Sequence, residues 1–383
     1  MDTVLVLFGG ALGLSGLGYV LAAIYCVGRF RPPPPEVAAP APPVTILKPL
    51  HGVDVELYEN LLSFCRQDYA PFQIVFGLRE ANDPAIAVVR RIEREFPALD
   101  IALVVAALDR GANPKVANLI NMLPAAKHDL LVIADSDMRV PPDYLGRVTA
   151  PLADPAVGAV TCLYAGRPAD ASLASRLGAL HINDWFLPSV LVAAALAPVD
   201  FCLGSTMALR RDALAAIGGF EALSGHLADD YMLGHLLTRA GYRVCLSDGL
   251  VETVVGDAGL AETLGRERRW ARTVRGVRPL AFAFSFPIFS LPVALLAALL
   301  LNSVEGGFPV GYSLVLAAML LRAVLHHRLR RLIGGTARPM FWLLPLRDVL
   351  GFGVWAASFL GGGMSWRGRK LSLGRHGRLR IKD

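Results

Sequence analysis

Charged side chains are scarce in this chain. Asp, Glu, Lys and Arg together make up 18% of its 383 residues, while 54% are hydrophobic; soluble proteins carry about a quarter of charged residues. The mean hydropathy of +0.48 is also high for a soluble protein. This deficit of charge argues against an ordinary soluble protein and predicts membrane segments.

Cysteine is also sparse, and its spacing suits neither cross-links nor zinc. The five cysteines are odd in number, widely separated and without a C-x-x-C pair: Cys26, Cys65, Cys162, Cys202 and Cys245. Neither a disulfide framework nor a zinc site is therefore predicted. The pattern fits the reducing conditions of the cytoplasm.

Basic residues are missing before the first apolar segment. Residues 3–27 are almost free of charge and long enough to cross a bilayer, with only Asp2 before them and Arg29 after them. A cleaved signal peptide would begin with positive charge, and basic residues favour the cytoplasmic side. We therefore expect a retained anchor over residues 1–28, with its amino end outside, and then a proline-rich linker over residues 29–43.

Between residues 44 and 278, short apolar runs alternate with helical segments. This alternation is typical of an α/β sheet covered by helices, and it predicts one cytoplasmic domain. The expected strands are 44–47, 72–78, 101–105, 130–133, 157–163 and 243–246. The expected helices are 57–66, 84–96, 115–122 and 144–152. The apolar segment 185–203 is interrupted by Pro188, Pro198 and Asp200, so we expect it to be buried or membrane-facing rather than a full span.

Residues 279–365 contain further apolar segments. Residues 279–301 and 309–325 are expected to be clear spans. The third segment, 340–363, contains Arg347 and Asp348, and an ionic pair at membrane depth is tolerated mainly where protein buries it. We therefore favour a re-entrant third segment.

The tail, residues 366–383, is strongly basic. Its single acid is Asp383, and its basic residues are Arg367, Arg369, Lys370, Arg375, Arg378, Arg380 and Lys382. Such a run beside apolar segments predicts contact with anionic lipid headgroups. Nucleic acid is not expected, because no nucleic-acid fold signature accompanies the run. A re-entrant third segment would return this tail to the cytoplasm.

Two carboxylates follow the apolar run of residues 130–133. Asp135 and Asp137 are one residue apart, so an extended chain points them to the same side. Carboxylates at the carboxyl edge of a sheet suit Mg²⁺ or Mn²⁺ carrying a diphosphate. The alternative is an ordinary turn after a strand, where Asp and Ser are common.

Two weaker signals lie earlier in the chain. Asp83 follows the second expected strand, where it could face the same crevice and bind a nucleoside, or simply cap the next helix with Pro84. Lys115 begins the helix before the carboxylate pair, a position suited to phosphate, although a solvated lysine is an equally simple interpretation.

Adjacent carboxylates recur at Asp229 and Asp230, just before an expected helix. One of them can cap that helix, which leaves the other free. Neighbouring acids in apolar surroundings have pKa values pushed apart, which suits a general base. The alternative is that both are acids favoured by the helix dipole.

Arg266 and Arg269 lie three residues apart on a helical segment, followed by Trp270. Both arginines share a face and could clamp a diphosphate, while Trp270 packs beneath a sugar or acceptor. A basic amphipathic helix at the membrane surface is the alternative.

In this order, the motifs resemble the ceramide glucosyltransferase family, glycosyltransferase family 21, which has the GT-A fold. The resemblance extends over residues 47–54, 83–86, 113–115, 135–137, 229–231, 266–270 and 365–367. It implies a GT-A α/β domain with terminal transmembrane helices, in which Asp83 contacts uridine, Asp135 and Asp137 hold the metal, and Asp230 is the base. The motif at residues 266–270 begins with Arg266, where Gln is commoner in the family.

Within the family, the chain resembles the bacterial hopanoid-biosynthesis branch. That similarity lies in residues 58–61, 63–65, 67–69, 72–77, 118–124 and 182–188. It implies transfer of N-acetylglucosamine from UDP-GlcNAc to a bacteriohopanoid, with inversion, at the cytoplasmic face of the bacterial inner membrane. Ceramide as the acceptor of glucose is the alternative. A processive polysaccharide synthase and a non-catalytic membrane scaffold are more distant alternatives.

Overall fold

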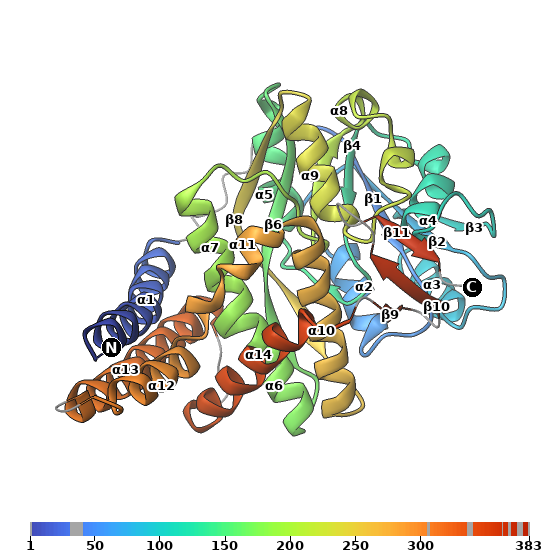
Figure 1. The fold of residues 1–383 in the computed structure, drawn as a ribbon. Helices are drawn as coiled ribbons and strands as arrows, with labels where there is room; N and C mark the ends of the chain where they lie inside the picture. Colours follow the sequence, from blue (N-terminus) through green and yellow to red (C-terminus); the bar gives the residue numbers. More distant parts are fainter. Residues whose placement is uncertain are drawn as a thin grey trace. The chain divides into compact units, whose positions relative to one another are not determined.

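The computed structural model describes residues 2–30, 41–304, 307–334, 340–361, 363–366, 369–373 and 378–381, which divide into two compact units (Figure 1). The sheet unit comprises Pro32–Ala169, Pro198–Val254 and Ser365–Asp383; the helical unit comprises Met1–Arg31, Asp170–Ala197 and Val255–Met364. Two segments of the predicted 44–278 domain, residues 170–197 and 255–278, pack in the helical unit. Most of the predicted linker, residues 31–40, lies outside the described part of the chain.

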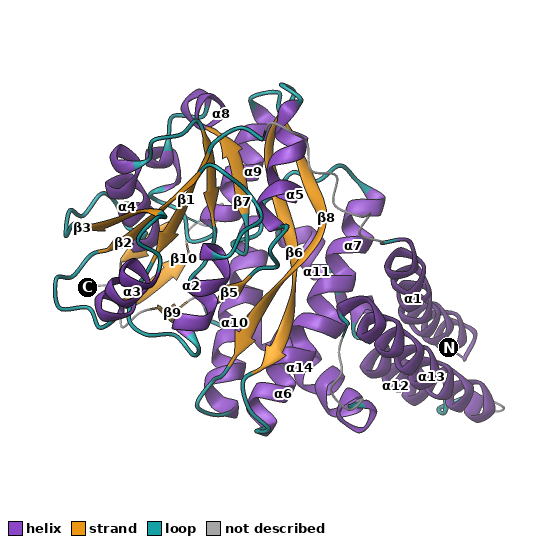
Figure 2. Cartoon of the chain, turned by 180° about the vertical axis from the view of Figure 1, so that it is seen from behind, coloured by secondary structure: helices purple, strands orange, loops and turns teal. Residues whose placement is uncertain are grey.

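The sheet unit is built on an eight-stranded mixed sheet in the order β3-β2-β1-β4-β7-β6-β8-β5 (Figure 2). Its strands are β1 Val44–Pro49, β2 Phe72–Leu78, β3 Asp100–Val105, β4 Leu130–Ile133, β5 Met138–Arg139, β6 Val157–Pro168, β7 Met207–Arg210 and β8 Arg243–Val255. β1 to β4 run parallel, while β7 is antiparallel to both β4 and β6. All six expected strands are present, and β5 and β7 were not expected.

Helices flank this sheet. They are α2 Leu57–Cys65, α3 Ala85–Glu95, α4 Pro114–Met122, α5 Tyr144–Thr149, α8 Arg211–Ala216 and α9 Asp229–Arg239, with short 3-10 turns at Leu123–Ala125, Ala150–Ala153 and Phe220–Leu223. A second, three-stranded sheet comprises β9 Gly363–Trp366, β10 Arg369–Leu373 and β11 Leu379–Ile381.

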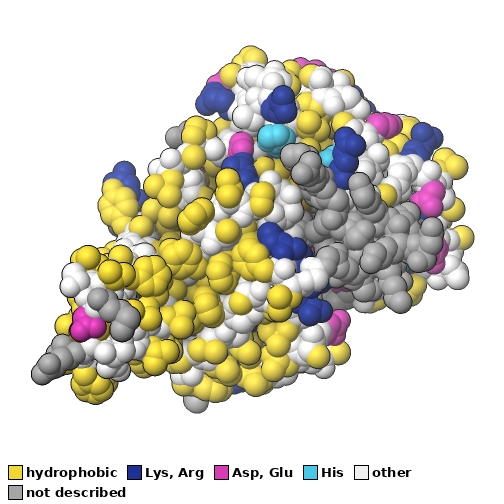
Figure 3. All heavy atoms as spheres, viewed as in Figure 1, with side chains coloured by type: hydrophobic (Ala, Val, Ile, Leu, Met, Phe, Trp, Pro, Cys, Tyr) yellow, Lys and Arg dark blue, Asp and Glu magenta, His cyan; other side chains and the backbone are white. Residues whose placement is uncertain are grey.

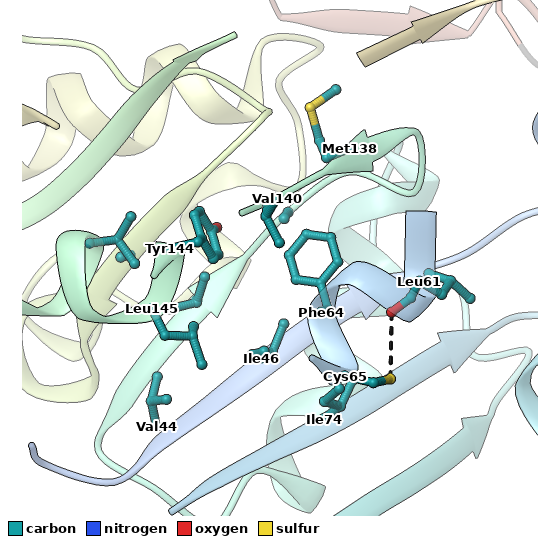
Figure 4. Close-up of a cluster of buried hydrophobic side chains, with 14 of the residues drawn as sticks. Val44, Ile46, Leu61, Phe64, Cys65, Ile74, Met138, Val140, Tyr144 and Leu145 are labelled. Atoms are coloured by element: carbon teal, nitrogen blue, oxygen red, sulfur yellow. Dashed lines mark hydrogen bonds between the residues drawn. The ribbon is translucent and has the colours of Figure 1, made fainter. Parts of the chain in front are cut away.

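A close-packed apolar cluster lies between the sheet and helices α2 and α5 (Figure 4). Ile46 of β1 and Ile74 of β2 are fully buried in it. The rings of Phe64 and Tyr144 meet edge-on with centroids 5.7 Å apart. Because packed cores yield little, this cluster gives the strand ends a firm support.

The helical unit contains the apolar helices. They are α1 Asp2–Arg29, α6 Leu173–His181, the π-helix η3 Ile182–Phe186, α7 Leu187–Leu196, α10 Leu260–Val277, α11 Pro279–Ala283, α12 Ser290–Leu301, α13 Gly307–Ile333 and α14 Leu344–Ser358, with 3-10 turns at Phe286–Ile288 and Phe341–Leu343. Large apolar side chains remain exposed, among them Phe8, Leu299 and Phe308. On the face shown in Figure 3, hydrophobic side chains are prominent where Figure 1 places these helices.

By length and apolarity, three described helices could cross a membrane: Asp2–Arg29, Leu173–Leu196 and Gly307–Ile333. For Leu173–Leu196, the residues on either side of the segment argue against a crossing. The residues that flank it, Ala169 and Pro198, both belong to the sheet unit, whereas one crossing would separate them by a membrane. A buried or membrane-facing element therefore stays the prediction for this segment.

The span expected over residues 279–301 is bent, and whether it crosses a membrane stays a prediction. The chain bends by 75° between Pro279–Ile288 and Ser290–Leu301. Pro287 lies in the 3-10 turn at this bend, and proline lacks the N–H that would continue a helix. The bent pair is either a broken span or a re-entrant loop.

The third C-terminal segment is short. Helix α14 has 15 residues, or about 22 Å at 1.5 Å per residue, which is less than the ~30 Å of a hydrocarbon core. Its Arg347 and Asp348 do not pair with each other as expected, because each is bound bidentately by another residue: Glu267 for Arg347 and Arg322 for Asp348.

Candidate active site

Asp135 and Asp137 lie in the turn that joins β4 to β5. Strand β4 is buried along its whole length between β1 and β7, so it ends firmly at Ile133. The Asp137 carboxylate accepts a hydrogen bond from Thr253 Oγ1 at 2.9 Å, and Ser136 Oγ donates to Asp54. The stretch is thus a turn, as the simpler interpretation expected, and it also holds a pair of carboxylates.

These carboxylates are crowded. Burial, and then the charge of Asp135, raise the pKa of Asp137 to about 6. Asp54 contributes in the same direction. A site that costs this much to charge is well suited to a cation that would balance the negative charge.

Lys48 holds the turn at Asp135 by a hydrogen bond from its buried side chain. Its side chain is fully buried in β1, its ammonium donates to the backbone oxygen of Asp135 at 2.6 Å, and it lies 3.8 Å from the Phe64 ring centroid. Burial lowers the pKa of Lys48 to about 7, although Asp135 and Asp137 act against this shift. A lysine inside an apolar strand was the sequence signal for this residue, and sequence reasoning missed it.

Lys115 bridges the two acidic motifs. Its ammonium lies 2.7 Å from Asp135 Oδ1 and 3.3 Å from Asp229 Oδ2. Burial disfavours its charge, but Asp135, Asp229 and Asp230 outweigh burial and raise the pKa of Lys115. Helix α4 begins here because Asn113 accepts bonds from the N–H groups of Lys115 and Val116. The solvated-lysine interpretation is therefore wrong.

Asp229 and Asp230 open helix α9, but neither caps it as expected, since Ala228 occupies the cap position and no side-chain cap bond forms there. Asp229 instead contacts Lys115 and Asn113. Asp230 accepts hydrogen bonds from Gly204 N at 2.9 Å and Tyr231 N at 2.7 Å. Burial, and then the charge of Asp229, raise the pKa of Asp230 to about 6, which suits a base near neutral pH.

Asp83 links the start of α3 to the loop after β1. Its two oxygens accept bonds from Ala85 N, at the start of α3, and from Gly52 N, each at 2.9 Å. The carboxylate is largely buried. Capping is therefore part of its role, and contact with a nucleoside remains a prediction.

Arg266, Arg269 and Trp270 lie on α10, in the helical unit. Arg266 donates to Asp257 at 2.7 Å and stacks over the Trp270 ring at 5.1 Å. Its Nε and Nη2 atoms are buried and have no hydrogen-bond partner among the described residues. His181 also stacks on the Trp270 ring, with centroids 6.0 Å apart. That these groups meet the diphosphate remains a prediction.

The basic tail joins the sheet unit through β11. Leu379 N donates to Gly225 O at 2.9 Å, and the backbones of Arg378 and His226 form an antiparallel β-bridge. Gly225 and His226 closely precede Asp229 in the chain. Of the predicted lipid-binding residues, Arg367, Arg375 and Lys382 lie outside the described residues.

The residues present fit a divalent cation that shares its ligands with a substrate. Among the described residues there is no group of three or more His, Cys, Asp or Glu side chains poised around one point. Mg²⁺ and similar ions are commonly held by one or two carboxylates, with substrate phosphates supplying further oxygens. Asp135 and Asp137 provide such a pair.

Comparison with known proteins identifies the family. The family model described as Glycosyl transferase family 21 matches residues 10–379. The chain belongs to glycosyl transferase family 21. The prediction of this family from the ordered motifs is thus confirmed.

Curated relatives in the family are named as ceramide glucosyltransferases. Ceramide glucosyltransferase 1 of Caenorhabditis elegans is 27% identical over 239 residues, which cover 60% of this chain and 49% of the relative. The chain spans about half the length of the first such relatives. A ceramide glucosyltransferase of Pyricularia oryzae is 23% identical over 436 residues, covering 90% of this chain and 87% of the relative. None of these names supports the hopanoid branch.

A solved structure supports the fold. The mannosyltransferase PcManGT from Pyrobaculum calidifontis, in complex with GDP-Man and Mn²⁺, matches with a TM-score of 0.54 and 22% identity, covering 93% of this chain and 99% of that one. The GT-A-like α/β fold predicted for the family member is therefore confirmed.

Proposed function

We propose that this family member is a membrane-bound glycosyltransferase that moves a sugar from a UDP-sugar to a hydroxyl group of a membrane lipid, with inversion. The observation that carries the proposal is the convergence of two acidic motifs in the sheet unit, where Lys115 contacts both Asp135 and Asp229. Asp137 and Asp230 also have raised pKa values, first because of burial and then because of a neighbouring carboxylate.

In this proposal the carboxylates divide the work. Asp135 and Asp137 would hold Mg²⁺ or Mn²⁺, which when bound neutralises the leaving diphosphate. Mn²⁺ accompanies GDP-Man in the related PcManGT structure. Asp230 accepts the proton of the acceptor hydroxyl, because the N–H groups of Gly204 and Tyr231 orient its carboxylate. A base so placed contributes roughly 10² to 10⁴ in rate.

The cationic groups bind the donor. Lys115, which contacts both Asp135 and Asp229, is the proposed phosphate contact at a helix start. The Nε and Nη2 atoms of Arg266 are buried and without partners among the described residues, so they could donate hydrogen bonds to a bound anion. Arg269 and Trp270, on the same helix, complete the predicted contacts, and Asp83 is the proposed uridine contact.

For the acceptor, the relatives favour ceramide over a hopanoid, because those that match are named ceramide glucosyltransferases. Glucose from UDP-glucose to a sphingoid lipid is therefore the better-supported pairing. The exposed apolar helices of the helical unit suit a lipid acceptor that stays in the bilayer.

Chain connectivity supports a proposed membrane placement. Residues 198–254 and the tail from Ser365 both belong to the sheet unit, so the chain between them crosses a membrane an even number of times. The bent pair together with Gly307–Ile333 would make two crossings, and the short α14 none. We propose that the sheet unit and the tail face the cytoplasm at the bacterial inner membrane, where the tail would meet anionic headgroups.

The test is to express the full chain in membranes and to identify the lipid product by mass spectrometry. UDP-glucose and UDP-GlcNAc are each supplied with ceramide and with a bacteriohopanoid. A single hexose on ceramide supports the proposal, and N-acetylhexosamine on the hopanoid restores the branch. An extended polymer would indicate a processive synthase, and no UDP release with any lipid would favour a scaffold.

A further inference from the structure

Gly204 lies between the two acidic motifs. It belongs to the turn that enters β7, where Leu203 and Thr206 form a bridge. Its N–H donates to Asp230 at 2.9 Å, and its carbonyl oxygen accepts from the N–H of Asp135 at 3.3 Å. One residue thus contacts both the proposed base and the proposed metal-holding carboxylate.

The absence of a side chain at this position is itself a structural requirement. A Cβ added to Gly204 would lie 2.6 Å from Asp135 Oδ2 and 3.5 Å from Asp230 Oδ2. The other Asp135 oxygen is held by Lys115 at 2.7 Å, so the carboxylate cannot turn away without losing that contact. Gly204 does not have a positive φ, so its need for glycine comes from space and not from backbone conformation.

The turn around Gly204 is fixed from behind. Thr161 Oγ1 accepts from Leu203 N at 2.8 Å and donates to Thr206 O at 2.7 Å. Ser205 Oγ donates to Cys162 O at 2.8 Å. Both Ser205 and Thr206 are buried, so the backbone has little freedom to retreat from an added methyl group.

We propose that Gly204 is a positioning residue that sets the separation between Asp135 and Asp230. Its N–H orients the base, and its bare Cα leaves the Asp135 carboxylate free to accept a metal ion. The inference rests on the proposed function, because displacement at a sugar carbon needs the leaving diphosphate and the acceptor hydroxyl at a set distance.

The experiment compares Gly204→Ala with Gly146→Ala in the full chain. Gly146, on α5, has no atom within 4 Å of an added Cβ, so its variant is the matched control. Binding of Mn²⁺ in the presence of UDP is measured by electron paramagnetic resonance, and turnover is measured separately. Gly204→Ala is expected to weaken Mn²⁺ binding by about 10- to 100-fold and to lower kcat by about 100-fold, while Gly146→Ala leaves both unchanged.

A double-variant cycle covers the case in which Gly204→Ala destabilises the fold. If the methyl group strains Asp135, Gly204→Ala/Asp135→Ala will unfold at the same temperature as Asp135→Ala alone. Persistence of the loss without the Asp135 carboxylate would overturn the proposal, as would wild-type Mn²⁺ binding and kcat in Gly204→Ala. Failure of the wild-type chain to glycosylate any lipid would refute the proposed function instead, and the Mn²⁺–UDP comparison would still decide on Gly204.

Discussion

The two units treat buried charge in opposite ways. In the helical unit, two buried carboxylates are each bound by one arginine: Arg347 donates to Glu267 at 2.8 and 2.7 Å, and Arg322 donates to Asp348 at 2.9 and 2.8 Å. Asp184 pairs with His326 at 2.9 Å. In the sheet unit, by contrast, acids crowd together around Lys115.

We take this difference as the contrast between structural charge and the proposed functional charge. A bidentate pair engages both carboxylate oxygens with one guanidinium and links helices distant in sequence. Burial, and then a neighbouring carboxylate, raise the pKa values of Asp137 and Asp230 to about 6. The folded state therefore binds these protons more tightly than the unfolded state, and the free energy of unfolding falls as the pH rises towards about 6. A protein tolerates that cost where a substrate or cation relieves it.

The largest effect is expected at the base. Asp230→Asn keeps the shape of the side chain but cannot accept the proton, so lipid glycosylation should fall by about 10² to 10⁴. UDP-sugar binding should remain near wild type, as measured by calorimetry. Asp229→Asn is the matched neighbour: if it abolishes turnover while Asp230→Asn retains most of it, the roles of the two carboxylates are reversed.

The next effect is expected at a matched pair. Arg347→Met leaves Glu267 fully buried without the guanidinium that binds both of its oxygens, and breaking such a pair costs about 3–5 kcal/mol. The expected result is a large drop in the unfolding temperature in detergent, with much of it restored in Arg347→Met/Glu267→Met. Arg90→Met is the control, because Arg90 pairs with Glu93 on the surface, where a pair is worth about 0–1 kcal/mol. An unfolding temperature equal to the control's would contradict the structural role.

Sequence reasoning located most of the fold and both acidic motifs. Buried apolar strands such as β4 are recognisable by composition, and the residues directly after such a strand must lie at the sheet edge. Strand β7 was missed because Met207–Arg210 has only four residues. The turn before it, at Leu203–Thr206, is defined by tertiary contacts and not by a sequence pattern. The 75° bend near Pro287 was missed because the length of an apolar segment does not show whether its helix is straight.

The partners of the acids could not be predicted in the same way. Lys115 was assigned to phosphate from its position at a helix start, yet its contacts with Asp135 and Asp229 join residues far apart in the chain. The role of Gly204 depends on two carboxylates converging on one Cα. Likewise, Arg347 and Asp348 are neighbours in sequence, but tertiary packing gives each a different partner.

A smaller effect is expected at Thr253. Thr253→Val preserves shape but removes the hydroxyl that donates to Asp137 at 2.9 Å, so the carboxylate loses its orientation and its pKa should rise further. We expect Mn²⁺ binding in the presence of UDP to weaken by about tenfold. Thr238→Val is the control, since its hydroxyl donates only to Gly234 O within α9. Equal Mn²⁺ affinity in the two variants would mean that the Thr253 bond is structural.

The smallest effect is a shift in pH dependence. Asp230 must be deprotonated to accept a proton, and its pKa is raised to about 6 by burial and then by Asp229, so kcat should fall as the pH drops through about 6. Asp229→Asn removes the neighbouring negative charge and leaves more of the Lys115 charge for Asp230, and both changes lower the pKa of Asp230. The acidic limb of the kcat profile should therefore move to lower pH, with Glu93→Gln, in the surface pair with Arg90 on α3, as the control. A limb that stays in place, or moves to higher pH, would mean that like-charge crowding does not set the proton affinity of the base, and the contrast between the two units would then rest on geometry alone.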